Sequence, residues 1–279
     1  MKKSSSVKRA WKIIAPLAIV MAIAGAALFG GGLALGGPAT VVWADGLQVV
    51  HRQIMTKELP DFNRVEVISH AVGVTIRPGN INSIEVTTTG VASMDPTWSV
   101  TDGTLTVNQP SQNTVQFSVL DLTPSIVTIT YAAPPSEVRV DSHTGSISVT
   151  GDIPTVLLST DTGDISRQGT TSDLTIESHT GRTEITGDTT NLSVDANTGV
   201  VDFQGATAEA HVQVTTGDIR LVVKANPARC SWSLTTSTGG ISADGDDSAT
   251  ARSHQVADAE RAITASTTTG SIDLSFVQS

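Results

Sequence analysis

Hydrophobic and polar residues alternate along the second half of the chain, and Thr-Gly pairs interrupt the alternation at a constant interval. Four successive intervals between these pairs are 18 residues long. On both sides of each pair every second residue is apolar, which is the pattern of a β-strand with one buried face. Each unit therefore predicts two strands joined by a Thr-Gly turn. The pairs are Thr144-Gly145, Thr162-Gly163, Thr180-Gly181, Thr198-Gly199 and Thr216-Gly217.

A second glycine recurs six residues after the first and marks the other corner of each unit, as at Gly151 and Gly169. One such unit cannot bury its own apolar face, whereas stacked units can pair strand on strand. The expected fold class is all-β: a parallel single-chain β-helix, or solenoid, with 18-residue coils that are regular over 138–223. Arg167 and Thr183 occupy inward positions, where we expect a local bulge or a side chain that reaches solvent.

The repeat pattern extends in both directions. Residues 65–76 echo 138–149, so the solenoid domain is expected to span 62–279. Two later pairs, Thr238-Gly239 and Thr269-Gly270, are expected to continue the series in order, with loops inserted between coils. The segment 244–262 is interpreted as an acidic insertion with a short helix at 254–261, and 263–279 as the last coil.

Two segments before the regular array have patterns of their own. Residues 83–91 resemble a partial coil, and Asp102-Gly103 lies between alternating residues as a hairpin turn does. A coil and a hairpin are therefore expected upstream of residue 138.

The N-terminal region has a different pattern. Five basic residues and no acidic residue occupy 1–12, and the apolar run 13–35 would span about 30 Å at 1.5 Å per residue. We expect a basic cytoplasmic tail (1–12), a transmembrane helix (13–37) and an extracytoplasmic stalk (38–61), with the C-terminal domain outside a cell membrane. A cleaved signal peptide is the alternative, and the length of the run favours the anchor.

Charge narrows the choice of partners. The 279 residues carry a net charge of −10, and outside the basic tail 12 Lys and Arg stand against 27 Asp and Glu, a net of −15. Nucleic acid is an unfavourable partner for such a surface because phosphates require a positive face. The single cysteine, Cys230, excludes an internal disulfide framework.

Several short motifs occur in a fixed order along the chain. They are the basic tail with one span, Ser-His-Ala-Val-Gly-Val-Thr-Ile (69–76), Asp-Gly-Thr-Leu-Thr-Val (102–107), Tyr-Ala-Ala-Pro-Pro (131–135) and the iterated Thr-Gly-Asp-Ile turns. Together they resemble the "putative adhesin" family of bacterial surface proteins over 62–276. The resemblance implies a β-helical, membrane-tethered protein of the bacterial envelope, with relatives linked to envelope stress. It implies no catalytic residue.

Candidate chemistry is concentrated at one position of the repeat. The residue before each turn threonine is polar on successive coils: His143, Asp161, His179 and Asn197. Adjacent coils would place such residues about 4.8 Å apart, so a metal or catalytic site is one interpretation and hydrogen-bonding turn residues the favoured one. No cofactor-binding motif is present.

The sequence thus favours a non-enzymatic binding or scaffold module whose partner is a cell-wall glycan or another envelope protein. Two alternatives remain. A final coil ending in Ile272, Leu274 and Phe276 would expose a strand edge through which the protein could self-associate. A polysaccharide-acting enzyme is the other, and it is disfavoured.

Overall fold

The computed structural model describes residues 39–43, 47–51, 53–88, 95–109, 125–244, 246–248 and 251–278. The chain divides into two compact units. In the first, β1 (Ala39–Trp43) and β2 (Leu47–His51) pair as an antiparallel hairpin. The second unit holds all the described residues from Gln53 onward, and it carries the repeats.

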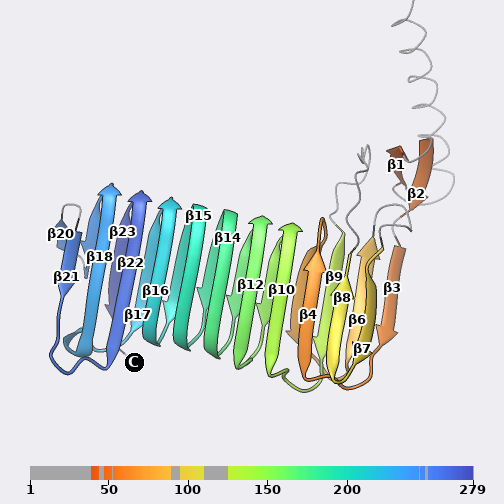
Figure 1. The fold of residues 1–279 in the computed structure, drawn as a ribbon, viewed down its shortest axis with the longest axis horizontal. Coiled ribbons are helices and arrows are strands. Elements are labelled where there is room, and N and C mark those ends of the chain that lie inside the picture. Colours follow the sequence, from red (N-terminus) through yellow and green to blue (C-terminus); the bar gives the residue numbers. More distant parts are fainter. Residues whose placement is uncertain are drawn as a thin grey trace, which may run out of the picture. The chain divides into compact units, whose positions relative to one another are not determined.

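The second unit consists of strands and one short 3₁₀ helix, η2 (Pro227–Arg229) (Figure 1). The strands before the repeats are β3 (Gln53–Glu58), β4 (Arg64–Ser69), β5 (Gly73–Pro78), β6 (Ser83–Thr88), β7 (Thr97–Thr101), β8 (Thr104–Asn108) and β9 (Ile126–Tyr131). The regular repeats form β10 (Glu137–Thr144), β11 (Ile147–Thr150), β12 (Thr155–Thr162), β13 (Ile165–Gln168), β14 (Thr171–Thr186), β15 (Thr189–Gly205), β16 (Thr207–Thr216) and β17 (Ile219–Lys224). The last strands are β18 (Cys230–Thr238), β19 (Ile241–Ala243), β20 (Asp246–Ser248), β21 (Ala251–His254), β22 (Arg261–Thr269) and β23 (Ile272–Val277).

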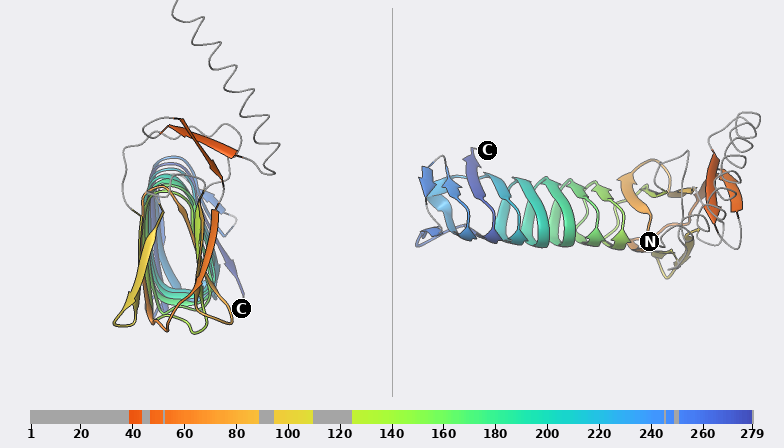
Figure 2. Two further views of the ribbon diagram at one scale, coloured as in Figure 1. Left: turned by 90° about the vertical axis from the view of Figure 1, so that its right-hand side faces the viewer. Right: turned by 90° about the horizontal axis from the view of Figure 1, so that it is seen from above.

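The 18-residue repeat sets the register of the middle of the sheet. Val138 pairs with Val156, Val156 with Leu174 and Leu174 with Leu192, all in parallel strands. Each repeat, called a rung below, runs along one side of the curled sheet and returns along the other (Figure 2). Equivalent residues of neighbouring rungs therefore lie in rows along the stack.

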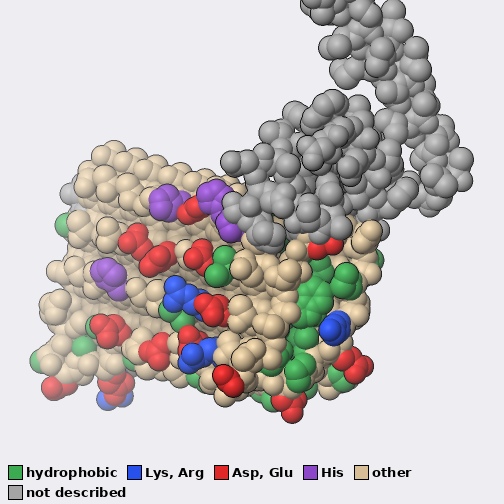
Figure 3. Space-filling model, turned by 45° about the vertical axis from the view of Figure 1, so that its right-hand side comes forward, with side chains coloured by type: hydrophobic (Ala, Val, Ile, Leu, Met, Phe, Trp, Pro, Cys, Tyr) green, Lys and Arg blue, Asp and Glu red, His purple; other side chains and the backbone are tan. Residues whose placement is uncertain are grey.

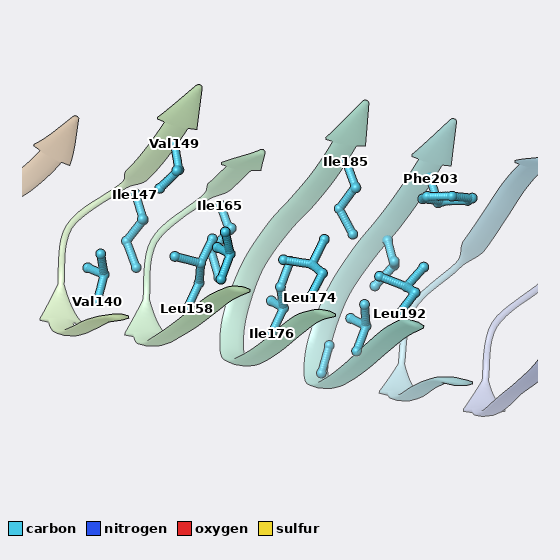
Figure 4. Packing of buried hydrophobic residues seen from close by; sticks show 14 of the residues in the cluster. Val140, Ile147, Val149, Leu158, Ile165, Leu174, Ile176, Ile185, Leu192 and Phe203 are labelled. Atoms are coloured by element: carbon cyan, nitrogen blue, oxygen red, sulfur yellow. The ribbon is translucent and has the colours of Figure 1, made fainter. Parts of the chain in front are cut away.

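The apolar positions of both sides point into the space between them (Figure 4). They bury almost completely, with Val140, Ile147, Leu158, Ile176 and Phe203 each at most 2% exposed. Their rows form one continuous core along the stack, so the stability of each rung depends on its neighbours.

Two details of the turns explain the repeated glycines and aspartates. At Gly181, φ is +151°, and a Cβ there would lie 2.0 Å from the carbonyl oxygen of Gly163 one rung away, so only glycine fits. The aspartate after a corner glycine accepts a hydrogen bond from a backbone N–H of the next rung. Asp164 does so from Arg182 (2.8 Å) and Asp188 from Ala206 (3.0 Å). Backbone donors at the corners are satisfied in this way.

The two ends of the sheet differ from its middle, because the chain turns back there. At the N-terminal end, β7 pairs antiparallel with β8, and β6 lies antiparallel between β3 and β9. The expected Asp-Gly hairpin is confirmed, with Thr101 opposite Thr104. The expected partial coil at 83–91 is wrong, because β6 runs against its neighbours instead of with them.

At the C-terminal end, the order of strands does not follow the sequence. β22 lies between β16 and β18, and β23 lies between β17 and β19. The last rung of the sequence is therefore an interior rung, and the expectation that it exposes a free edge is wrong. β21 and β20 cover the outer rung by pairing antiparallel with β18 and β19. The short helix expected at 254–261 is absent: β21 ends at His254, a turn follows, and β22 begins at Arg261.

These ends overturn the expected fold class, while the all-β content is as expected. The 21 strands of the second unit form one open, curled sheet of mixed parallel and antiparallel pairs, not a β-helix that is parallel throughout. Within the described part of the chain, no helix has the length and apolar character needed to cross a membrane. The expected transmembrane helix at 13–37 lies outside the described residues, as does the basic tail at 1–12.

Arg167 and Thr183 neither form a bulge nor reach solvent. Both are 1% exposed and continue the inward rows. The Arg167 guanidinium donates to the carbonyl oxygens of Gln168 and Thr170 and to the Thr171 hydroxyl. Burial lowers the pKa of Arg167. Carbonyl oxygens at the corner thus accept hydrogen bonds from the buried guanidinium. The alternation of apolar and polar residues did not indicate this arrangement.

Candidate functional site

The outward side chains of the first strand of each rung form the candidate site. This surface, called the acidic face below, comprises the outward residues of β4, β10, β12, the first halves of β14 and β15, and β16, with the turn residues that follow them. Figure 3 shows a row with histidines and a carboxylate along one edge, one further histidine apart from that row, and more carboxylates in the rows beside it. Its carboxylates are Glu66, Glu137, Asp141, Asp161, Asp173, Glu177, Asp195 and Glu209, and its cations are Arg64 and Arg139.

The predicted row of polar turn residues, His143, Asp161, His179 and Asn197, lies along the turn edge of the acidic face and is called the ladder. The Nδ1 atom of His143 contacts the carboxylate of Asp161, and Nδ1 of His179 lies 3.9 Å from the other carboxylate oxygen. The register of β10, β12 and β14 brings these three residues together from separate rungs. Asn197 is exposed one rung further on, and no hydrogen bond joins it to the rest of the ladder among the described residues.

The structure adds His70 to this row. β4 pairs with β10 so that Ser69 is opposite Ser142, which places His70 beside His143 with ring centroids 6.5 Å apart. Gln109 holds this turn: its side-chain oxygen accepts from the backbone N–H of His70 (3.0 Å), and its carbonyl oxygen lies 2.9 Å from Nδ1 of His70. The similarity of 65–76 to 138–149 contained this signal.

The ladder is open to solvent. The side chains of His143, Asp161 and His179 are 67%, 52% and 70% exposed. Within the described residues, no three His, Cys, Asp or Glu side chains lie close enough to hold a metal ion. Because water screens each of these exposed groups, the ladder can form individually weak hydrogen bonds and charge contacts at a surface.

The predicted turn residues occupy the edge next to the ladder. Thr144, Thr162, Thr180, Thr198 and Thr216 are exposed, and each is followed by its corner glycine. Gly145, Gly163, Gly181, Gly199 and Gly217 all have positive φ, between 142° and 152°. The turns therefore present side chains of equivalent threonines to solvent in one row.

Two neighbouring hollows, together called the groove, lie on the acidic face over β4, β10, β12 and β14. One hollow of about 340 Å³ is lined by side chains of β4 and β10, and a smaller one of about 70 Å³ by those of β10, β12 and β14. Arg139 and Asp141 line both hollows. At one end of the groove, Arg64 and Glu137 form an ion pair of 2.9 Å. Sequence reasoning missed the groove because it is formed by side chains from different rungs.

The outward residues of the second strands carry charges that are largely paired. Arg182 donates to Asp202 at 2.5 Å, Arg220 lies 3.9 Å from Asp273, and Lys224 lies 3.5 Å from Asp188. The hydrogen bond and charge of Asp202 raise the pKa of Arg182. The hydrogen bond from the Ala206 N–H, with the Lys224 charge, lowers the pKa of Asp188. This surface is called the paired face below.

Solved structures with a similar course of the chain share little sequence with it. A protein titled a "putative cell adhesion protein" from Clostridium sporogenes ATCC 15579 is 13% identical, with 81% of this chain and 100% of that chain covered and a TM-score of 0.37. A "putative adhesin" from Bacteroides fragilis NCTC 9343 is 11% identical, with 81% and 97% covered and a TM-score of 0.35. A "putative lipid binding protein" from Parabacteroides distasonis ATCC 8503 is 12% identical, with 81% and 97% covered and a TM-score of 0.38.

No curated protein matches the sequence. The family model named Toastrack DUF4097 matches residues 136–275, which include every rung from β10 to β23 except the chain's last few residues. The resemblance found in the sequence motifs is thereby confirmed, and the chain belongs to the Toastrack DUF4097 family.

Proposed function

We propose that this protein is a non-enzymatic binding module, anchored in a bacterial cell membrane by residues 13–37, which contacts a basic partner protein of the envelope through its acidic face. The observation that carries the proposal is the difference in charge between two faces built on one register. The acidic face has eight carboxylates and two arginines, whereas cations on the paired face lie beside carboxylates.

Charge in this arrangement favours an interaction with a cationic surface. Glu177 is in register with Asp195 on the next rung, so their carboxylates repel one another with no cation between them. A basic partner relieves this repulsion and is steered toward the face at low ionic strength. Membrane attachment is supported by the charge and hydropathy pattern of residues 1–37.

A protein partner suits the acidic face better than the cell-wall glycan that the sequence also allowed. The outward residues of this face include no Phe, Tyr or Trp ring on which a sugar could stack. The hydroxyls of a neutral glycan can donate hydrogen bonds to the unpaired carboxylates, but they do not neutralise the negative charge as a cationic protein surface does. The free strand edge that suggested self-association is not present at the last coil, because β20 and β21 cover the outer rung of the described residues.

Site-specific photo-cross-linking tests the proposal. A photoreactive amino acid replaces Glu177 on the acidic face in the full-length chain, expressed in intact cells. The matched control replaces Glu184, which is an exposed glutamate on the paired face. We expect a discrete cross-linked protein with a basic surface from position 177 and not from 184. Equal products from both positions, or none from 177, would contradict the proposal.

A further inference from the structure

The groove across the acidic face contains the outward aliphatic side chains of that face. In the three rows that continue Glu137, Arg139 and Asp141 through β4, β12, β14, β15 and β16, every described residue is polar except Ile68 and Leu157. Both line the groove, Ile68 beside Asp141 and Leu157 beside Arg139. Ile68 is 39% exposed. Binding of a ligand that covers such an exposed apolar side chain is favourable, because it removes apolar surface from water.

The groove also holds unpaired charges of both signs. No carboxylate lies within 4 Å of the Arg139 guanidinium, and no cation within 4 Å of the Asp141 or Glu177 carboxylates, among the described residues. Arg64 and Glu137, by contrast, are already paired. A ligand that satisfies Arg139 must carry an acidic group, and one that satisfies Asp141 and Glu177 must carry basic groups.

These groups follow one another along the stack in a fixed order. Ile68 (β4), Asp141 (β10), Glu177 (β14) and Asp195 (β15) belong to one row. Arg139 (β10) and Leu157 (β12) lie in the row beside it, two residues earlier on their strands. Neighbouring strands are about 4.8 Å apart, so the line from Ile68 to Asp195 is about 19 Å long. In an extended peptide, side chains on one side recur about every 6.7 Å, and seven residues cover about 20 Å. Four same-side residues therefore reach from Ile68 to Asp195.

We propose that this groove binds an extended segment of the partner protein, lying along the stack, with the same-side order aliphatic, acidic, basic, basic. The aliphatic residue covers Ile68, the acidic residue pairs with Arg139, and the two basic residues pair with Glu177 and Asp195. The inference rests on the proposed function, because it assigns the segment by which that partner docks. Arg139 sets the specificity, since a uniformly basic segment would leave Arg139 opposed by like charge.

The probe is the synthetic peptide Leu-Ser-Glu-Ser-Lys-Ser-Lys, labelled at its N-terminus and titrated with the purified full-length protein by fluorescence anisotropy. The control peptide, Leu-Ser-Lys-Ser-Glu-Ser-Lys, has the same composition and net charge, with the glutamate and the first lysine exchanged. We expect saturable binding of the probe that is about threefold to tenfold tighter than that of the control, and that weakens with added salt. Equal affinity for the two peptides, or no saturable binding, would overturn the groove assignment.

Two variants test whether the peptide binds at the groove. Arg139→Glu should weaken the probe about threefold to tenfold and reduce its preference over the control peptide. Glu184→Lys, on the paired face, should change probe binding by less than twofold. Both residues are exposed, and circular dichroism should show the same fold. Binding that is indifferent to Arg139→Glu, or tighter binding of chitotetraose than of the peptide, would overturn the inference.

The failure of this inference and the failure of the proposed function give different results. Loss of the peptide preference with a retained cross-link from position 177 means that the partner uses another part of the acidic face. Loss of the cross-link from position 177 contradicts the partner-binding role itself.

Discussion

The acidic face and the paired face share one backbone register and differ in how charges are distributed along it. On the paired face, Arg220 is in register with both Asp202 and Asp273. Asp202 also follows Glu184 in this row, but Arg182 forms an ion pair with it. On the acidic face, Glu177 is followed in register by Asp195. Each side chain lies about 4.8 Å from its counterpart on the next rung, so attraction or repulsion between charges acts between neighbours along the row.

The difference shows that the fold does not require the charge pattern of the acidic face. In the same stack, each of Arg182, Arg220 and Lys224 on one side lies beside a carboxylate, whereas on the other side Arg139, Asp141, Glu177 and Asp195 form no ion pair with a described residue. Unpaired like charges lower stability. Binding of another molecule would therefore relieve more electrostatic repulsion on the acidic face than on the paired face.

The largest effect is expected in the core that supports both faces. Ile176 is fully buried, in register with Leu158 and Val194. Ile176→Asp would bury an unpaired carboxylate and should lower the free energy of unfolding by more than about 4 kcal/mol, which abolishes both faces together. Urea unfolding followed by circular dichroism measures the change. The same substitution at the neighbouring outward residue, Thr175→Asp, should cost less than about 1 kcal/mol; similar losses from the two would contradict the assigned sides of β14.

A smaller loss is expected at the turn edge between the faces. Gly181→Ala should lower the free energy of unfolding by about 1–3 kcal/mol, because the residue has positive φ and its new Cβ would collide with the Gly163 carbonyl. The matched control is Gly240→Ala, where a Cβ meets nothing within 4 Å. Thermal denaturation of both variants compares them, and a tolerated alanine at 181 would show that the rungs are spaced more widely than described.

Charge removal distinguishes the faces directly. Arg182→Ala deletes the cation that pairs with Asp202 and should slightly lower the denaturation midpoint, with the difference vanishing in 1 M NaCl. Glu177→Gln on the acidic face should leave the midpoint unchanged or raise it slightly, since it removes repulsion from Asp195. Opposite signs for the two variants at low salt are the expected result. A destabilising Glu177→Gln would mean that this carboxylate has a stabilising partner within the chain.

The smallest effect concerns pH and the corner aspartates. The folded state lowers the pKa of Asp188 below the value of 3.8 taken for a free aspartate, chiefly through the Ala206 N–H. The stabilising contribution is therefore complete above the unfolded pKa and is lost as pH falls through the lower folded pKa. Between pH 5 and pH 2.5, stability should decrease less in Asp188→Asn than in the unchanged protein, as measured by urea unfolding. An identical decrease in both would show that this carboxylate does not contribute.

Much of the architecture was predictable because it is local and periodic. The strands around each Thr-Gly turn, the inward rows such as Val138 and Val156, and the Asp-Gly hairpin all follow from alternation and turn chemistry. The position of His70 was also present in the sequence, in the similarity of 65–76 to 138–149. The groove could not be predicted, since its lining combines β4 with β10 and β12, which are separated in sequence.

By itself, the sequence determined the 18-residue register, the buried rows and the outward positions of His143, Asp161 and His179, because alternation specifies which side of a strand is buried. Tertiary structure alone decided that β22 and β23 enter between earlier strands, that antiparallel strands close both ends, and that Arg167 is buried among corner carbonyls. The physical reason is that periodicity identifies a strand and its buried side, whereas strand order is a competition among edges that only the folded chain resolves.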